Sequence, residues 1–510
     1  MTRLLPVLLS IWFSLPLFAA PPQSQWVHPG PDGKLAYKTT ERGDRVMDFS
    51  HAGYMGGGWA IPEAPVEGTV KPSGQDDTGA IQKTLDDVAR LPMKRTGLRG
   101  AVLLGPGSFQ CSNTITISAS GVILRGSGLS TVIRMTGSPH NAISVRATEG
   151  RRQNSTAFFE SQLVDDYVPS GASAFHVKSG AGFSVGDVIE IRKPVTEAWV
   201  KFMQMDDLVR DGKAQTWLKP GNHLVAERRI TAVAGNKISI DVPLSDSFDA
   251  SLLTPPGTTV VKIRPPNRLA QVGIENLKIV CPEQAINHTQ AHFTAIRLNA
   301  EDAWIREVVA EETMNSISLN GCRITLQRVA VIRKARHEGS SKPAEFAPNA
   351  SQALLDRCSV TADNVWFVAT GSGVSGPLVL LNCEFNGSGA VEAHQRWSTG
   401  MLYDNCKAPR GSLEFRNRGS MGSGHGWGMG WGVAWNCEAE HFVIQNPPGA
   451  INWMIGCIGE NKAMPRPFAK EPLLPRGTEE SDGKHVLPQS LYLSQLQERL
   501  GKDALKNIGY

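Results

Sequence analysis

Two short segments in the last third of the chain carry the residue types that acid–base chemistry needs. The sequence EAHQRW contains His394 and Arg396, and the sequence RNRG contains Arg416 and Arg418. Each His or Arg of the first segment lies 22 positions before an Arg of the second. If that distance is one turn of a repeating, strand-rich structure, His394 stacks over Arg416 and Arg396 over Arg418. An imidazole beside guanidinium groups is a candidate general base, because positive neighbours disfavour its charged form.

Strand alternation predicts which of these side chains share a surface. Every second residue of a strand points to the same side, so Glu392, His394 and Arg396 should share the outward face with the two later arginines. The opposite parity holds three amides, which we expect to form an interior hydrogen-bonded ladder: Gln395, Asn417 and Asn446. Arginines on neighbouring coils repel one another and need an anion. Two interpretations are open: an ion-pair network with Glu392 and Glu414, or an acidic ligand held by bidentate arginines.

A glycine-rich segment follows directly, reading GSMGSGHGWGMGWG over residues 419–432. Glycines let a loop approach a ligand closely, and we expect Trp427 and Trp431 to stack on sugar rings. His425 lies in the middle of this loop and is a second candidate for acid–base work. Trp435 and Trp453 are expected in the core. No Lys-Ser/Thr pattern of a nucleotide-binding loop accompanies the glycines.

The elements that must position these residues repeat along the chain. Short apolar segments bounded by Gly, Asn or Asp align on one position each: Leu277, Val308, Val329, Cys358, Cys383, Cys406, Cys437 and Cys457. The successive spacings are 31, 21, 29, 25, 23, 31 and 20 residues. Such spacings without amphipathic helices predict coils of an all-β, single-stranded right-handed parallel β-helix. A cysteine at one place of each coil suggests stacked, packed thiols, although bridges between neighbours stay open.

The N-terminal part begins with a second recognisable pattern. The sequence DDTGAIQKTL at 76–85 predicts an amphipathic helix that covers the open end of a solenoid. With the runs VLLGPGSF, ITI and VILRGSG at 102–109, 115–117 and 122–128, it resembles the entry into pectate-lyase-like β-helix proteins of the pectin lyase-like superfamily. The resemblance implies the fold. It leaves the reaction open, because lyases, hydrolases and phage tailspikes share that fold.

The segments HQRW, LYDN, RNRG and GSGHGW also resemble part of secreted bacterial β-helix proteins grouped with polysaccharide lyases. On a lyase hypothesis, Arg396 and Arg418 neutralise a uronate carboxylate and His394 removes the adjacent proton. Either His425 or Tyr403 then protonates the leaving oxygen. Further substrate contacts are expected from five residues: Arg416, Trp397, Trp427, Trp431 and Glu392.

Two other functions stay open. A glycoside hydrolase needs two carboxyl groups around the scissile bond. The GHG of 424–426 is similar to β-helix polygalacturonases, but their Asn-x-Asp and Asp-Asp signals are missing at matching positions. A non-catalytic glycan-binding β-helix would explain the tryptophans but not the His/Arg cluster. No metal ligand set is predicted, and calcium is the one cofactor left open.

Composition and the chain ends suggest organisation and location. The chain has 510 residues with 52 Lys+Arg and 48 Asp+Glu, and no basic block of a nucleic-acid binder. Residues 1–20 predict a signal peptide, hence a secreted or periplasmic protein that is free of the membrane after cleavage. We expect a monomer whose partner is an acidic polysaccharide. The expected divisions are 21–149 for the cap and first coils, 150–268 for a β-rich insertion, 269–465 for the main β-helix and 466–510 for a linker and C-terminal helix.

Overall fold

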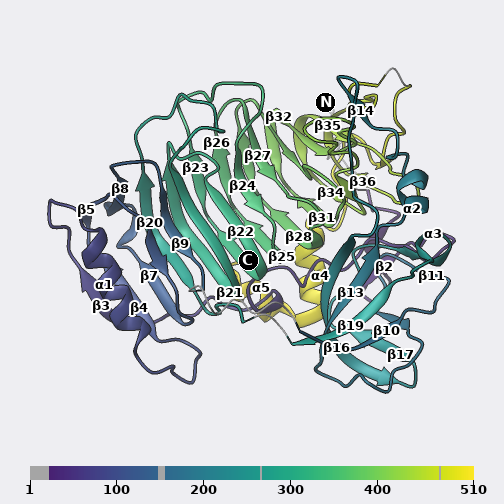
Figure 1. The fold of residues 1–510 in the computed structure, drawn as a ribbon, viewed down its shortest axis with the longest axis horizontal. Coiled ribbons are helices and arrows are strands. Elements are labelled where there is room, and N and C mark those ends of the chain that lie inside the picture. Colours follow the sequence, from purple (N-terminus) through teal and green to yellow (C-terminus); the bar gives the residue numbers. More distant parts are fainter. Residues whose placement is uncertain (1–21, 148–155, 265–266, 470–471) are drawn as a thin grey trace, which may run out of the picture.

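The computed structural model describes residues 22–147, 156–264, 267–469 and 472–510. The predicted signal peptide lies outside these residues. Parallel strands stack side by side over most of the molecule, in a 26-stranded sheet that winds around a continuous apolar core (Figure 1). None of the helices in the described residues is long and apolar enough to cross a membrane.

A coil of this structure contributes strands to three faces, which we name A, B and C in chain order. Face A contains β3 Val66–Val70, β4 Gly100–Leu104, β7 Val122–Arg125, β25 Ser351–Asp356, β28 Ser375–Leu381, β31 Ser398–Asp404, β34 Val433–Trp435, β36 Trp453–Ile455 and β38 Thr478–Glu480. Face B contains β5 Gly107–Cys111, β8 Thr131–Met135, β23 Ala330–Ile332, β26 Ser359–Thr361 and β29 Glu384–Asn386. Face C contains β6 Ile115–Ile117, β9 Asn141–Val145, β24 Ala344–Pro348, β27 Val365–Ala369 and β30 Gly389–Glu392. Longer strands bend across faces: β20 Gly273–Val280, β21 Thr294–Glu311, β22 Ile317–Gln327, β32 Lys407–Phe415, β35 Glu438–Ile444 and β37 Ile458–Asn461.

Each strand pairs in parallel with the equivalent strand of the next coil, which confirms the predicted parallel β-helix. The register also confirms the repeat alignment. Leu277 is the partner of Val308. Ser359, directly after Cys358, is the partner of Glu384, directly after Cys383. The cysteines therefore stack at the corner between faces A and B.

All eight cysteines are buried and free. The thiols of the five cysteines from Cys358 to Cys457 donate to backbone carbonyls of the coil below, as Cys383 does to Leu355 O at 3.3 Å and Cys406 to Leu380 O at 3.3 Å. Burial raises the pKa of the Cys383 thiol well above its ordinary value. The cysteines act as small apolar residues with a weak donor, as the repeat suggested.

Helices cover the N-terminal end and one side of the β-helix. The predicted capping helix is present as α1 Thr78–Ala89, which buries Ile81, Leu85 and Val88 against the first coils (Figure 1). Near the C-terminus, α4 Leu491–Leu500 and α5 Lys502–Asn507 pack beside face A. The backbone N–H of Tyr492 and the hydroxyl of Ser490 both donate to the buried carboxyl of Asp404, which fixes the start of α4 on β31.

An antiparallel sheet interrupts the β-helix between its first and later coils. Its strand order is β10 Thr156–Gln162, β19 Thr259–Arg264, β13 Val188–Pro194, β16 His223–Ala234, β17 Lys237–Ile240 and β12 Ala174–His176. We call it the inserted sheet. The chain then returns to the coil it left, because Gly273 of β20 pairs with Ile123 of β7 and Lys278 pairs with Val132 of β8. The excursion therefore adds a lobe beside the β-helix without shifting its repeat.

Thiol labelling tests the packing of the cysteines. Since every thiol is buried without a bridge, all eight should react with a maleimide after denaturation without reductant, and hardly any should react in the native protein. Mass spectrometry counts the labels. Fewer labels on the denatured protein than on a reduced sample would show disulfides between neighbouring coils.

The carboxyl of Asp404 predicts a pH dependence of stability. Burial raises its pKa from 3.8 to about 7, so between these values the folded protein holds a proton that the unfolded chain releases. Below pH 3.8 the protonated carboxyl contributes fully to the free energy of unfolding. This contribution is lost as the pH rises to about 7. Over that window the wild type should lose up to about 1.4 kcal/mol per pH unit relative to Asp404→Asn.

Denaturant unfolding at pH values across this window measures the difference. Asp503→Asn, at an exposed position of α5, is the matched control and should follow the wild type at every pH. Parallel pH curves for wild type and Asp404→Asn would contradict the prediction.

Candidate functional site

The two motifs lie on adjacent coils, where the chain leaves face C and turns toward face A. Glu392 ends β30 and is the register partner of Glu414 in β32, which confirms the 22-residue spacing. The strand alternation stops there. Arg396 and Trp397 have φ of 52° and 62°, in the left-handed region. The predicted stacking of His394 over Arg416 and Arg396 over Arg418 is therefore wrong.

The buried carboxylate of Glu392 joins the motifs instead. Its side chain is 1% exposed, and its Oε1 accepts from both the Arg418 guanidinium and His394 Nδ1. Burial opposes ionisation, but the charges of Arg418 and His394 outweigh it, and the pKa of Glu392 is lowered. The carboxylate thus stays ionised and holds residues from two successive loops.

The His394 ring lies between Glu392 and Arg418. A carboxylate only accepts, so the contact with Glu392 requires a proton on Nδ1. Arg418 Nη1 contacts the same Nδ1 and lies 3.3 Å from Nε2. At that distance the hydrogen bond is long and weak. With 18% of its side chain exposed, His394 has the arrangement of a general base whose orienting partner is Glu392.

Aromatic rings enclose His394 on two sides. Its ring centroid lies 5.1 Å from Trp366 and 4.9 Å from His425. The Arg418 guanidinium also lies 4.8 Å from the Trp366 ring. Sequence reasoning missed Trp366. The signal was present in its outward parity on β27, one coil before Ala390.

His425 lies at the site in its neutral form. Burial and the nearby His394 and Arg418 lower its pKa to about 3. Its Nδ1 is buried and has no hydrogen-bond partner within the described residues. A neutral imidazole can still donate its N–H to a ligand oxygen.

The ion-pair interpretation holds for two of the three arginines. Arg418 and Arg416 are engaged in ion pairs, with Glu392 and with Glu414 Oε2 at 3.2 Å. Arg396 differs, because its guanidinium donates to Ser423 Oγ at 2.6 Å and to Ser423 O at 2.9 Å. No carboxylate among residues 22–147, 156–264, 267–469 and 472–510 forms an ion pair with Arg396.

Tyr403 does not reach the site, which corrects its predicted role as an acid. Its side chain is fully buried inside the coil and stacks on Phe415 at 4.5 Å. Its hydroxyl faces the carbonyls of Val391 and Glu414 at 3.4 Å. Burial also raises its pKa far above the ordinary value. Tyr403 occupies a position of β31 whose side chain points to the interior of the coil.

The predicted amide ladder is also wrong. Asn417 N donates to Gln445 Oε1 at 2.8 Å, so Asn417 pairs with Gln445 rather than with Asn446. Asn446 instead accepts from the backbone N–H of Asn452. The loops after β32 and β35 do not keep strand register, so equal parity does not bring these amides together.

The tryptophans of the site loops are buried and do not form sugar platforms. Trp397, Trp427 and Trp431 are each at most 3% exposed, while Trp435 and Trp453 lie in the core as predicted. Trp427 Nε1 donates to Met203 O at 3.0 Å, and Trp397 Nε1 donates to Asp246 at 2.9 Å. Their partners belong to the insertion, so these rings fix the site loops to it.

The glycine-rich loop also packs against the insertion. A Cβ on Gly426 would lie 2.4 Å from the Trp217 ring, and Gly426 has φ of 54°. Trp217 Nε1 donates to Trp427 O at 3.1 Å. Glycine is required here for close approach to the insertion rather than to a ligand.

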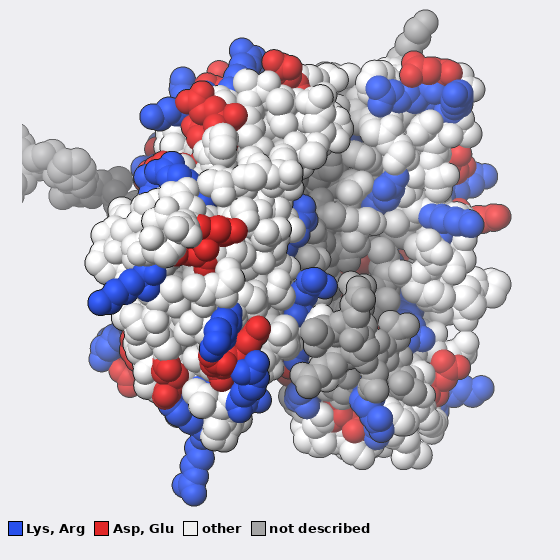
Figure 2. All heavy atoms as spheres, turned by 60° about the vertical axis from the view of Figure 1, so that its left-hand side comes forward, with Lys and Arg blue, Asp and Glu red and all other residues white. Residues whose placement is uncertain are grey.

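A polar groove of about 560 Å³ adjoins these loops. One wall comes from Glu190, Val225 and Glu227 of the inserted sheet, and the other from β-helix turns that include Ser375. The backbone N–H of Gly373, which lines the groove, donates to Arg396 O at 3.0 Å. The molecular surface is hollowed between two lobes, and some of the Lys and Arg side chains that are spread over this face border the hollow (Figure 2).

The donor set does not fit a calcium ion. Calcium requires six to eight oxygen ligands, whereas the site offers Glu392 and Glu414, each already paired with an arginine. Within the described residues, no three His, Cys, Asp or Glu side chains cluster in a way that could hold a metal ion.

No protein-family model and no curated protein sequence matches the chain. It is similar in structure to the Gp54 tailspike of Acinetobacter baumannii bacteriophage AP22, with 13% identity, a TM-score of 0.42 and coverage of 76% of this chain and 56% of that one. The tailspike gp49 of Pseudomonas phage LKA1 gives 14% identity, a TM-score of 0.34 and coverage of 76% and 67%. The A-module of mannuronan C-5 epimerase AlgE4 from Azotobacter vinelandii gives 10% identity, a TM-score of 0.24 and coverage of 84% of this chain and 91% of that one. The chain spans little more than half of the AP22 tailspike.

Removing the charge of Glu392 should destabilise the fold. In Glu392→Gln the buried guanidinium of Arg418 loses its counter-ion, and breaking a buried pair in this way costs about 3–5 kcal/mol. Glu384→Gln, at an exposed position of β29, should change the free energy of unfolding by less than about 0.5 kcal/mol. Denaturant unfolding compares the two. Equal stability of both variants would show that the pair does not hold the loops.

Proposed function

We propose that the protein is a polysaccharide lyase that cleaves an acidic, uronate-containing polysaccharide by β-elimination. The observation that carries the proposal is the pairing of His394, oriented by a buried carboxylate, with an arginine that lacks a carboxylate partner among the described residues. In the tautomer that donates from Nδ1 to Glu392, His394 offers a lone pair on Nε2, and Arg396 offers a positive charge two residues further along the chain. A base beside an anion-binding group is what proton removal next to a carboxylate requires.

The steps follow from these positions. Arg396 pairs with the uronate carboxylate and lowers the cost of negative charge at the adjacent carbon. The proton on that carbon passes to His394 Nε2, and its electron pair forms the new carbon–carbon double bond as the glycosidic C–O bond breaks. The leaving oxygen takes a proton from the His425 N–H, which regains one from water, while His394 returns its proton to water. No water is added to the product.

Arg418 and Glu392 act on His394 rather than on the substrate. Glu392 fixes the ring through Nδ1, and Arg418 keeps Glu392 ionised. Glu392 and Arg418 are therefore positioning residues in the proposed mechanism.

A hydrolytic mechanism has less support from the carboxyl groups. Glu392 and Glu414 lie on adjacent coils, but each is buried and paired with an arginine. A hydrolase needs one carboxylic acid with a raised pKa to protonate the leaving oxygen. The pKa of Glu392 is lowered instead.

Substitution of His394 tests the mechanism. Against a panel of acidic polysaccharides, the wild type should release products with the ultraviolet absorbance of an unsaturated uronide, and His394→Ala should lower kcat about 10²–10⁴-fold. His485→Ala, which removes a half-buried histidine paired with Glu438 away from the site, is the matched control and should keep wild-type activity.

Mass spectrometry of the products separates the three functions. A fragment lighter by one water than the hydrolytic fragment supports the lyase, and a hydrated fragment overturns it in favour of a hydrolase. Binding of a polysaccharide without any product would identify a glycan-binding protein. Undiminished activity in His394→Ala would remove His394 from its role as the base.

A further inference from the structure

A loop at residues 333–343, between β23 and β24, brings a lysine to the edge of the site. The Lys342 ammonium lies 4.9 Å from the ring centroid of Trp366. The same indole lies 5.1 Å from the His394 ring. Lys342 and His394 therefore lie within about 10 Å of each other, on one outward-facing aromatic side chain of face C.

Lys342 has no carboxylate partner in the part of the chain that the structure describes. It is half-buried, and its recorded contact is the cation–π contact with Trp366. Arg418 lies against the same indole at 4.8 Å, and its charge is already balanced by Glu392. The half-buried charge of Lys342 is thus left without a protein anion beside a second cation, an arrangement that an anionic ligand would stabilise.

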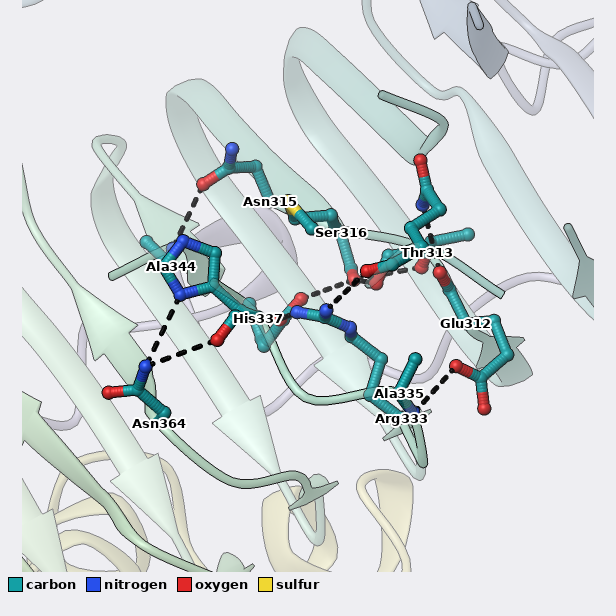
Figure 3. A network of polar contacts seen from close by, with 12 residues as sticks. Glu312, Thr313, Asn315, Ser316, Arg333, Ala335, His337, Ala344 and Asn364 are labelled. Atoms are coloured by element: carbon teal, nitrogen blue, oxygen red, sulfur yellow. Dashed lines mark hydrogen bonds and ion pairs between the residues drawn. The ribbon is translucent and has the colours of Figure 1, made fainter. Parts of the chain in front are cut away.

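A buried polar network holds this loop in place (Figure 3). Arg333 Nη1 lies 3.4 Å from Glu345 Oε1, and Ser316 Oγ donates to Glu345 Oε2 at 2.5 Å. Both charged side chains are at most 1% exposed. At the start of the loop, the Glu312 carboxylate accepts from the N–H groups of Lys334 and Ala335 at 2.9 and 3.2 Å.

The middle of the loop is fixed to the next coil. Asn364 Nδ2 donates to His337 O at 3.3 Å and faces His337 Nδ1 at 3.4 Å. His337 is buried, and Asn364 precedes β27, the strand that carries Trp366. The loop is bonded to the β-helix at Lys334, at His337 and, just after Lys342, at Ala344, whose N–H donates to Asn315. Lys342 is therefore presented to Trp366 by a preorganised loop, which reduces the entropic cost of binding.

We infer that Lys342 and Trp366 form an accessory subsite, which binds the acidic sugar residue next to the one that is cleaved. The ammonium pairs with the carboxylate of that residue, and the indole packs against the apolar side of its ring. The inference rests on the proposed function, because it places the neighbouring unit of the same chain beside His394. It assigns recognition of two successive acidic residues to different cations, Arg396 and Lys342.

Kinetics on oligosaccharides of graded length test the subsite. Oligogalacturonates and oligomannuronates serve as probes, and Lys342→Gln should raise KM about fivefold on long oligomers, the effect of losing one partly exposed ion pair. The value of kcat should stay unchanged, and the shortest cleaved oligomer should show no difference. Lys342→Arg should restore KM. Lys83→Gln is the matched control and should behave as wild type, because Lys83 is at an exposed position of α1, at the N-terminal end of the β-helix.

Calorimetric binding of the same oligomers separates this inference from the proposed function. If the wild type cleaves and Lys342→Gln has wild-type KM at every length, the subsite is overturned and the lyase stands. If no probe is cleaved but Lys342→Gln weakens binding about fivefold, the subsite stands without the lyase. Wild-type protein that neither binds nor cleaves any probe overturns the subsite. An equal loss on short and long oligomers also overturns it, since that places Lys342 at the cleaved residue.

Discussion

The buried carboxylate of Glu392 is the interaction on which the site depends. An ionised group at 1% exposure persists only when it is paired, and its two partners come from different coils. Arg418 belongs to the loop after β32, whereas His394 belongs to the loop after β30. One carboxylate therefore fixes the relative position of two loops that have no strand register, and it orients the imidazole between them.

The insertion supplies the second constraint, because the site loops have conformations that the β-helix alone does not enforce. Arg396 and Trp397 both have left-handed backbone angles, which cost free energy in residues other than glycine. Trp397 is held by its hydrogen bond to Asp246 and by ring contacts with Trp199 and Trp217 at 5.7 and 6.0 Å. The aromatic contacts with the insertion thus offset the strain that turns Arg396 toward Ser423.

The repeat could be predicted from the sequence, and the site loops could not. A cysteine or aliphatic residue at one corner of each coil is a local signal, and register pairs such as Leu277 with Val308 reproduce it. The 22-residue spacing holds in the strands, where Glu392 is the partner of Glu414. Alternation ends with the strands, so it failed for His394 and Arg396. The burial of Trp427 depends on Met203, 224 positions away in sequence, and no local pattern encodes that contact.

The distribution of charge around the site argues for a polymeric rather than a single-residue ligand. Arg416 and Arg418 are neutralised by Glu414 and Glu392, so the centre of the cluster is balanced. Arg396, which donates to Ser423, and Lys342, which lies over Trp366, lack carboxylate partners among the described residues. A monovalent anion could satisfy one of these cations and leave the other unpaired. A chain with a carboxylate on successive residues satisfies both, and it would place one residue against the Nε2 of His394 while the next lies against Trp366.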